Sequence, residues 1–224
     1  MSSKIVKYFE IDSTNLEAKR LIDVQSVENT VIISAKRQTH GRGRLDRNWI
    51  SMEGNLMFSI VLPQSWVRLP MLLPACCAIA VREAIYPNNS ILFKWPNDVL
   101  IAENENPKKC CGILIEKYGD FYIIGIGINV EFAPEGNTVF PAACLKQYSI
   151  EIQDEEKIFQ NLLPLLNKSN KEIVSKWQES NFFQNKSVKI NEIEGIFNGV
   201  DENFNAIVLC GNEKKIVSFG DVGM

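Results

Sequence analysis

The succession of apolar and polar positions predicts a mixed α/β region followed by a shorter all-β region. Residues 12–22 begin with Asp-Ser-Thr-Asn, side chains that cap helix N-termini, and continue with an apolar face, which predicts a helix. Residues 70–85 form an apolar run typical of a core helix, and residues 149–177 are largely helical in pattern. β-Branched and apolar runs predict strands at 30–35, 55–62, 91–93, 99–101, 111–117 and 121–130.

From about residue 184 the pattern changes to short strands separated by turns, at 187–190, 195–200, 206–210 and 215–219. This change predicts two domains, residues 1–183 and residues 184–224, of which the second is a small β-barrel. The first region lacks the regular β-α-β-α alternation of a doubly wound fold, so the expected class is α+β. The sequence contains neither a Walker phosphate loop nor a Gly-x-Gly-x-x-Gly motif, so a nucleotide would need another kind of site.

Composition narrows the function classes. With 224 residues, 46% hydrophobic and 23% charged, the chain can form a sizeable core. A net charge of −3 disfavours a protein that binds nucleic acid over a broad basic surface. No apolar run reaches the roughly 20 residues that span a bilayer, and the N-terminus lacks a signal-peptide core, so we expect a cytoplasmic protein without a membrane partner. The six cysteines form no Cys-x-x-Cys motif, which favours reduced, mostly buried thiols.

One loop, residues 38–49, combines two glycines with three arginines in the order Gln-Thr-His-Gly-Arg-Gly-Arg-Leu-Asp-Arg-Asn-Trp. Glycines let the backbone approach a ligand closely, and arginines suit carboxylate and phosphate groups. The loop therefore indicates an anion site, or else a solvated loop or a basic patch that contacts nucleic acid. His40 is the only histidine, so the sequence offers no histidine triad or histidine–metal cluster.

Three further segments carry polar residues or glycines beside apolar strands. Lys-Trp-Pro-Asn-Asp at 94–98 fixes two polar side chains at a sheet edge, or forms an ordinary tight turn. Lys109 enters an apolar strand that contains Gly112, where a ligand could fit, unless the lysine is a simple exposed end residue. Gly125 and Gly127 strip one face of their strand, which admits a flat ring, another backbone or close strand packing.

Together with Asp-Ser-Thr-Asn at 12–15, these segments resemble the biotin–protein ligases (biotin–[acetyl-CoA-carboxylase] ligases) in order and spacing, over about residues 8–135. The resemblance implies a catalytic domain of mixed sheet and flanking helices, similar to class II synthetases, and a C-terminal SH3-like β-barrel. His40 stands where the family often has a small residue, and Asp46 where it often has glycine. About a dozen residues precede Ser13, too few for the DNA-binding domain of larger members, so we expect a short form that does not bind DNA.

The resemblance also implies the roles of individual residues. The residues expected to bind biotin are Ser13, Thr14, Asn15, Gln38, Arg42, Gly43, Arg44, Trp49, Lys109, Gly112 and Gly125. The residues expected to bind the nucleotide are Arg42, Arg44, Arg47, Lys109 and Asn129. Lys109 and Arg44 are the expected catalytic residues, and Asp98 is a candidate metal ligand.

The implied reaction has two steps: biotin and ATP, with Mg²⁺, give biotinyl-5′-AMP, and a carrier lysine then accepts the biotin. The expected carrier is a biotin carboxyl carrier protein or domain of acetyl-CoA carboxylase or of another biotin-dependent carboxylase, and a homodimer is compatible with the family. One alternative is a lipoate or octanoate ligase of the same fold, although its typical Arg-Arg-x-x-Gly-Gly-Gly loop is absent. Another is a non-catalytic nucleic-acid-binding protein that uses Arg42, Arg44 and Arg47.

Overall fold

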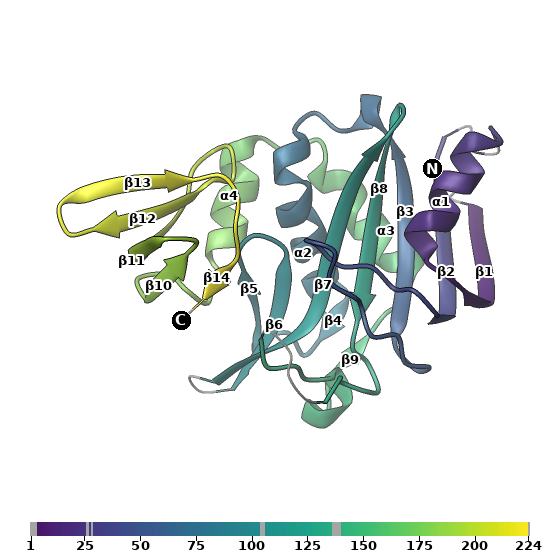
Figure 1. Cartoon of the computed structure of the whole chain (residues 1–224), viewed down its shortest axis with the longest axis horizontal. Helices are drawn as coiled ribbons and strands as arrows, with labels where there is room; N and C mark the ends of the chain where they lie inside the picture. Colours follow the sequence, from purple (N-terminus) through teal and green to yellow (C-terminus); the bar gives the residue numbers. More distant parts are fainter. Residues whose placement is uncertain (1–3, 26, 28, 104–105, 136–139, 224) are drawn as a thin grey trace.

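The computed structural model describes residues 4–25, 27, 29–103, 106–135 and 140–223. Its centre is a seven-stranded mixed sheet in the order β1-β2-β3-β8-β7-β6-β5 (Figure 1). β1 runs parallel to β2, and the other neighbouring strands pair antiparallel. The strands are β1 (Lys4–Ile11), β2 (Val31–Gln38), β3 (Leu56–Pro63), β5 (Ile91–Lys94), β6 (Asp98–Glu103), β7 (Asn106–Tyr118) and β8 (Phe121–Ile128).

Alternate residues of the central strands point to opposite faces of the sheet and build two cores. In β3, Phe58 and Ile60 belong to the main core, whereas Val61 packs in a smaller core with Ala18 of α1. The helices α2 (Leu73–Glu83) and α3 (Glu155–Leu165) cover the main-core face, and α1 (Thr14–Asp23) covers part of the opposite face (Figure 1). The loop after β2 covers another part of that opposite face, where Trp49 lies against β7 and β8.

Short elements complete this region. The helix α4 (Asn170–Gln178) packs against α2 and β11, and the two-residue strands β4 (Ile85–Tyr86) and β9 (Glu151–Ile152) pair with each other. Single 3₁₀ turns lie at η1 (Gln64–Trp66), η2 (Pro70–Leu72) and η3 (Leu145–Tyr148).

A second, five-stranded antiparallel sheet contains the C-terminal residues, in the order β13-β12-β11-β10-β14. Its strands are β10 (Ser187–Ile190), β11 (Ile193–Val200), β12 (Ala206–Cys210), β13 (Glu213–Val217) and β14 (Val222–Gly223). Trp177 of α4 stacks on Phe93 with ring centroids 6.0 Å apart and meets Phe204 edge-on at 5.0 Å, so aromatic packing joins the two regions. The α+β class and the small β region are confirmed, whereas the boundary at residue 184 and the SH3-like description stay predictions.

The structure refines the predicted boundaries in three places. The predicted helix at 70–85 begins as a 3₁₀ turn and ends at Glu83, because Ile85 already pairs in β4. The prediction that residues 149–177 are largely helical is confirmed, and the structure divides them into two helices. Asp154 caps α3 by accepting from Lys157 N at 3.0 Å, and Ser169 caps α4. The strand predicted at 111–117 is longer than expected, because β7 already starts at Asn106; residues 104–105 lie outside the described residues.

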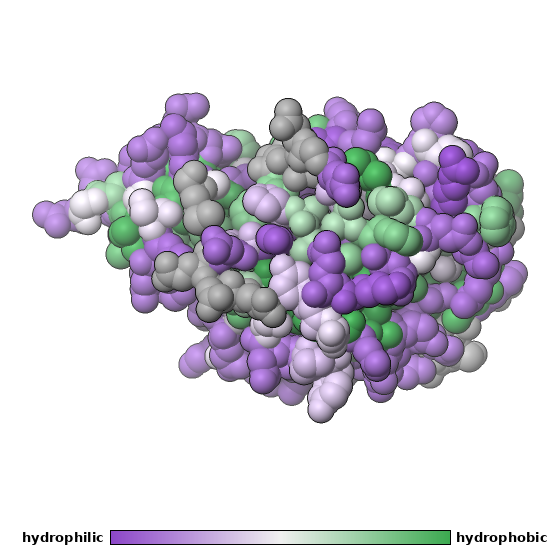
Figure 2. All heavy atoms as spheres, turned by 90° about the horizontal axis from the view of Figure 1, so that it is seen from below, coloured by the Kyte–Doolittle hydropathy of each residue, from purple (hydrophilic) through white to green (hydrophobic). Residues whose placement is uncertain are grey.

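All six cysteines are free thiols, and Cys210 is the one that is not buried. Burial raises the pKa of Cys76 and of Cys110 to about 12, so both stay protonated at neutral pH. This bears out the prediction of mostly buried thiols. Among the described residues, none of the helices combines the length and apolar character needed to cross a bilayer. The face shown in Figure 2 is mostly hydrophilic, with apolar patches between the polar side chains.

Candidate active site

A cavity of about 780 Å³ lies on the face of the sheet that α1 partly covers. Its floor includes Gly112 and Leu114 of β7 and Gly125 and Gly127 of β8, and the loop after β2 forms one wall. The C-terminal β region contributes Lys189, Asn191, Asp221, Val222 and Gly223 to the lining. The volume is in the range of pockets that hold small molecules and cofactors.

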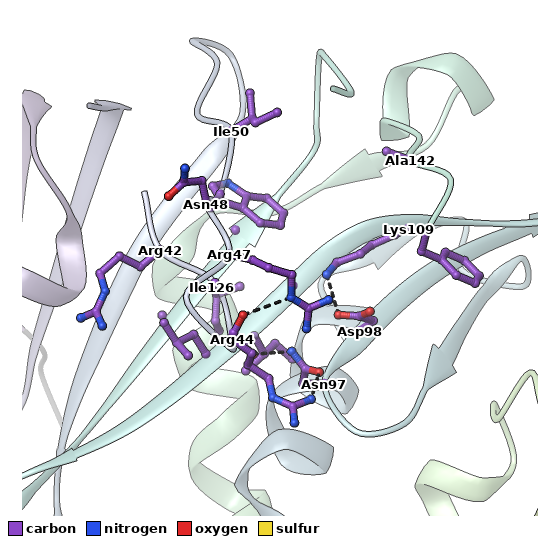
Figure 3. A pocket seen from close by; sticks show the side chains of 18 of the residues that line it. Arg42, Arg44, Arg47, Asn48, Ile50, Asn97, Asp98, Lys109, Ile126 and Ala142 are labelled. Atoms are coloured by element: carbon purple, nitrogen blue, oxygen red, sulfur yellow. Dashed lines mark hydrogen bonds and ion pairs between the residues drawn. The ribbon is translucent and has the colours of Figure 1, made fainter. Parts of the chain in front are cut away.

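The loop that forms this wall is shaped by its own backbone hydrogen bonds. Trp49 N donates to Gly41 O at 2.9 Å, and Gly43 N donates to Arg47 O at 2.7 Å. A side chain at position 41 would overlap the Trp49 carbonyl, so glycine is required there for the loop to close on itself. The loop therefore folds as a compact hairpin that presents Arg44 and Arg47 to one end of the cavity (Figure 3).

Two arginines of this loop share one carboxylate of the C-terminal region. Arg44 Nη1 lies 2.9 Å from Asp221 Oδ1, and Arg47 Nη2 lies 2.6 Å from Asp221 Oδ2. Arg44 Nη1 also donates to Asn97 Oδ1 at 2.8 Å. Burial acts to raise the pKa of Asp221, but the two arginines outweigh it and hold that pKa below its ordinary value. The arginines are thus already fixed around one carboxylate in the free protein.

Lys109 completes this cationic end of the cavity. Its ammonium lies 2.7 Å from Asp98 Oδ1 and 5.9 Å from the centre of the Trp49 ring (Figure 3). Lys94 approaches the other oxygen, Asp98 Oδ2, at 3.4 Å, so one buried carboxylate stands between two ammonium groups. More cationic than anionic side chains line the cavity, which favours an anionic ligand at this end.

The opposite end of the cavity is built from neutral polar groups. Gln38 Oε1 accepts a hydrogen bond from Thr14 N at 2.8 Å and lies 3.1 Å from Thr14 Oγ1. Ser59 Oγ lies 2.7 Å from Thr14 Oγ1 and 2.6 Å from Asn15 Oδ1. Ser13, Thr14, Asn15 and Ser59 are all buried, so these groups form a desolvated hydrogen-bonding pocket.

The third loop arginine has a different position. Arg42 Nη1 lies 3.2 Å from Glu116 Oε1, and its side chain points away from the cluster of Arg44, Arg47 and Lys109 (Figure 3). The sequence grouped all three arginines with the nucleotide. In the free protein Arg42 instead lies beside the neutral polar end, so its assignment to the nucleotide stays a prediction.

The bare face of β8 is filled by side chains of the protein. A methyl group on Gly125 would overlap the amide of Asn15, and one on Gly127 would overlap the indole of Trp49. The sequence analysis expected this face to receive a ring, another backbone or close packing. The structure places Asn15 and Trp49 there, because only glycine leaves enough room for them.

Every residue that the sequence analysis assigned to the site lines this one cavity. The set is Ser13, Thr14, Asn15, Gln38, Arg42, Gly43, Arg44, Arg47, Trp49, Asp98, Lys109, Gly112, Gly125 and Asn129. Sequence reasoning missed Ser59, although a lone polar residue in the apolar run of β3 is a usable signal. It also missed Glu116, which contacts Asn15 and Arg42 of the lining, and the whole contribution of residues 189–223, for which the sequence carries no motif.

The comparisons with known proteins agree with this geometry. The family model described as "Biotin/lipoate A/B protein ligase family" matches residues 8–131. The bifunctional ligase/repressor BirA of Bacillus subtilis is 34% identical over 178 residues, which cover 73% of this chain and 52% of that protein. A biotin–[acetyl-CoA-carboxylase] ligase of Paracoccus denitrificans is 34% identical over 142 residues, 59% of this chain and 57% of that protein. The chain thus spans about half the length of these curated relatives.

Among solved structures, the biotin protein ligase from Aquifex aeolicus in complex with biotin and ATP superposes with a TM-score of 0.81 at 28% identity, over 99% of this chain and 98% of that one. The family model covers more than half of the described fold, including α1, the loop after β2, and strands β5 to β8. On this basis the chain belongs to the biotin/lipoate A/B protein ligase family.

Proposed function

We propose that the protein is an ATP-dependent biotin–protein ligase, which forms biotinyl-5′-AMP and transfers the biotin to a lysine of a carrier domain. One observation carries the proposal: a single cavity joins a neutral hydrogen-bonding end at Thr14 and Gln38 to a cationic end at Arg44, Arg47 and Lys109. A molecule with a polar neutral head and a carboxylate tail matches both ends. The Aquifex aeolicus ligase that holds biotin and ATP, and the related biotin–[acetyl-CoA-carboxylase] ligase of Paracoccus denitrificans, support the same ligands.

The neutral end suits the cyclic urea of biotin. A ureido group carries one carbonyl acceptor and two N–H donors, so its pocket must offer both kinds of partner. Gln38 Oε1 accepts from Thr14 N, so the amide nitrogen Nε2 is left to donate to a ureido carbonyl. Ser13, Thr14 and Asn15 supply oxygen atoms from the start of α1. Trp49 and Gly112 border the central part of the cavity, where the apolar chain of biotin would lie.

In the first step the biotin carboxylate attacks the α-phosphate of ATP, and pyrophosphate leaves. Two anions must come together, so the site has to supply fixed positive charge before the reaction begins. Lys109, Arg44 and Arg47 provide it, and their existing ion pairs with Asp98 and Asp221 hold them in position. In our proposal, Lys109 and Arg44 contact the reacting atoms, which are the biotin carboxylate and the α-phosphate.

Asn129 is a candidate reader of the adenine ring. Its Nδ2 donates to Ala143 O at 3.2 Å, and its Oδ1 is buried and, within the described residues, has no hydrogen-bond partner. A buried acceptor without a partner is costly, and the exocyclic amine of adenine would satisfy it. The proposed contact of Asn129 with adenine is therefore made by its Oδ1, which accepts from the exocyclic amine.

Magnesium would enter with the triphosphate and screen its charge. Mg²⁺ commonly binds through one or two carboxylates together with substrate phosphates and water. Asp98 lines the cavity and fits a single protein ligand of this kind, although two ammonium groups already balance its charge. Asp98 is therefore the candidate protein ligand of this ion. Asp98 also orients Lys109.

In the second step the amine of a carrier lysine attacks the carbonyl of the mixed anhydride, a new amide forms, and AMP leaves. The intermediate must be protected from water until the carrier arrives. The hairpin loop at 41–49 borders the cavity and is suited to this purpose. The proposed carrier is the biotin carboxyl carrier domain of acetyl-CoA carboxylase or of another biotin-dependent carboxylase. A homodimer stays a prediction.

A nucleic-acid partner is not favoured by the same contacts. Arg42, Arg44 and Arg47 all line one cavity of about 780 Å³, which suits a small anionic ligand better than the backbone of a nucleic acid. To separate biotin from lipoate, each acid is added to the protein with ATP and Mg²⁺, and exchange of labelled pyrophosphate into ATP is measured. Exchange with biotin alone supports the proposal, whereas exchange with lipoate or octanoate alone would replace it with the rival ligase.

A further inference from the structure

Glu116 of β7 receives three hydrogen bonds or ion pairs behind Asn15 and Arg42, which line the cavity. Asn15 Nδ2 donates to its Oε2 at 2.8 Å, Lys19 Nζ donates to its Oε1 at 2.8 Å, and Arg42 Nη1 lies 3.2 Å from the same oxygen. α1, the loop after β2 and β7 thus meet at one carboxylate. The proposed reaction gives this carboxylate no chemical task.

Glu116 is ionised and can only accept hydrogen bonds. Burial acts to raise its pKa, but the hydrogen bonds from Lys19 and Asn15 and the charge of Arg42 outweigh burial and keep the pKa below its ordinary value. An acceptor-only partner forces Asn15 to turn its amide nitrogen toward Glu116. The amide oxygen of Asn15 must then face Ser59, 2.6 Å away.

The orientation of the Asn15 amide determines which groups donate and which accept along a row of hydrogen-bonded side chains. We call this row the polar chain and define it as Asn15, Ser59, Thr14 and Gln38. Ser59 has a single hydroxyl proton, and Asn15 Oδ1 can only accept, so that proton serves Asn15. Thr14 also has one hydroxyl proton. We assign this proton to the 2.7 Å contact with Ser59 and not to Gln38 Oε1, which lies farther away at 3.1 Å and accepts from Thr14 N. Thr14 Oγ1 is left with acceptor capacity, and Gln38, whose oxygen accepts from Thr14 N, is left with a donor.

We propose that Glu116 is a positioning residue that fixes the direction of hydrogen bonding along the polar chain and so gives the neutral end of the cavity its specificity for a cyclic urea. The pocket then offers an acceptor at Thr14 and a donor at Gln38. A ureido group has the complementary N–H and carbonyl, whereas the dithiolane of lipoate has no N–H to give. The inference rests on the proposed biotin ligase function and deepens it.

The decisive variant is Glu116→Gln in the full chain. The glutamine keeps the length of the side chain but can present an amine to Asn15, so the polar chain is no longer held in one direction. We expect the dissociation constant for biotin, measured by titration calorimetry, to rise by roughly tenfold or more, as expected when a charge-assisted network is lost. The KM for ATP in pyrophosphate exchange stays within about twofold, because the cationic end is untouched.

A second variant interrupts the polar chain without touching Glu116. Ser59→Ala removes the hydroxyl that connects Asn15 to Thr14, and the change is small enough for the buried strand β3 to accept. We expect the same split: weaker biotin binding and an unchanged KM for ATP. If Glu116→Gln lowers the melting temperature below the assay range, Ser59→Ala alone decides the question.

Two control variants separate hydrogen-bond direction from charge. Glu17→Gln removes a carboxylate of α1 that contacts Tyr8 and Arg20, so biotin binding should not change. Lys19→Met removes one ion pair of Glu116 but leaves its bond to Asn15, and the biotin affinity should stay within about threefold. The inference is overturned if Glu116→Gln and Ser59→Ala bind biotin as the wild type does, if the KM for ATP rises in step, or if Lys19→Met is as weak as Glu116→Gln. Absence of biotin binding by the wild type itself would instead reject the proposed function and the inference with it.

Discussion

At the residue scale, the site depends on charges that are held in place before any ligand arrives. Lys109 and Lys94 flank Asp98, and Arg44 and Arg47 flank Asp221, so each group of cations is fixed by one carboxylate. Fixed charges of this kind stabilise a transition state without reorganising during the reaction. The side chain of Lys109 is 27% exposed, so it is partly shielded from water but still reaches the cavity.

The first residue-scale prediction concerns Lys109. We expect Lys109→Ala to lower biotin-dependent pyrophosphate exchange by about 10²-fold or more, because the ammonium no longer offsets the approaching anions. Biotin binding by calorimetry should change far less, since the neutral end of the cavity, at Thr14 and Gln38, lies away from Lys109. Exchange at a near-normal rate would remove Lys109 from the catalytic residues.

The second concerns Arg44, which connects the loop to Asn97 and Asp221. Arg44→Gly should weaken retention of biotinyl-5′-AMP, with release faster by roughly tenfold, because the loop loses its attachments beside the intermediate. The released intermediate would then biotinylate lysines of a bystander protein. A matched Arg68→Gly variant, outside the cavity lining, should retain target selectivity. Selective labelling by Arg44→Gly would contradict this role.

Sequence reasoning at this scale found the residues that lie in recognisable segments and missed their partners. Arg44 and Lys109 belong to patterned motifs, so their types and spacing were informative. Asp221 is a single carboxylate in a region without a motif, and it reaches Arg44 only through tertiary packing. Glu116 lies at the end of an apolar strand, where a solvated charge is the ordinary interpretation.

At the element scale, strand β8 packs closely against its neighbours because two of its residues are glycines. Gly127 leaves space for the Trp49 indole, and Gly125 leaves space for the Asn15 amide. The alternation of the strand explains why both glycines lie on one face. The sequence therefore predicted the bare face correctly, but it could not tell whether a ligand or a side chain of the protein would fill it.

This packing gives an element-scale prediction. Gly127→Ala should displace Trp49 and the loop that carries it, lowering the free energy of unfolding by about 1–3 kcal/mol and weakening both biotin and ATP binding. Gly119→Asn provides a control, because Gly119 has open space around it and asparagine tolerates its positive φ of 55°. Equal stability and affinity of the two variants would show that Trp49 does not depend on the glycine face.

At the scale of the whole molecule, the C-terminal β region forms part of the cavity wall. Asp221 joins that region to the loop through Arg44 and Arg47, and Trp177 joins it to the sheet through Phe93 and Phe204. The sequence predicted the strands of this region from their turns and apolar runs. Its position against the loop depends on contacts between distant residues, which local patterns do not encode.

A whole-molecule prediction follows from Asp221. Asp221→Asn should increase tryptic cleavage within residues 41–48 of the unliganded protein and lower the free energy of unfolding by about 1–2 kcal/mol at neutral pH. The pKa of Asp221 is lowered in the folded state, so its stabilisation is complete above the ordinary value of 3.8 and is lost as the pH falls through the lower folded value. The difference between wild type and variant should therefore vanish in strong acid. A difference that persists there, or cleavage equal to that of the wild type, would contradict the coupling.

The central claim is that one cavity activates biotin with ATP for transfer to a carrier. The most direct measurement is incubation of the full chain with ATP, Mg²⁺ and radiolabelled biotin, with and without a biotin carrier domain. We predict labelled biotinyl-5′-AMP in the absence of the carrier and a covalent label on one carrier lysine in its presence. Failure to form the adenylate, or formation of an adenylate only when lipoate replaces biotin, would contradict the account.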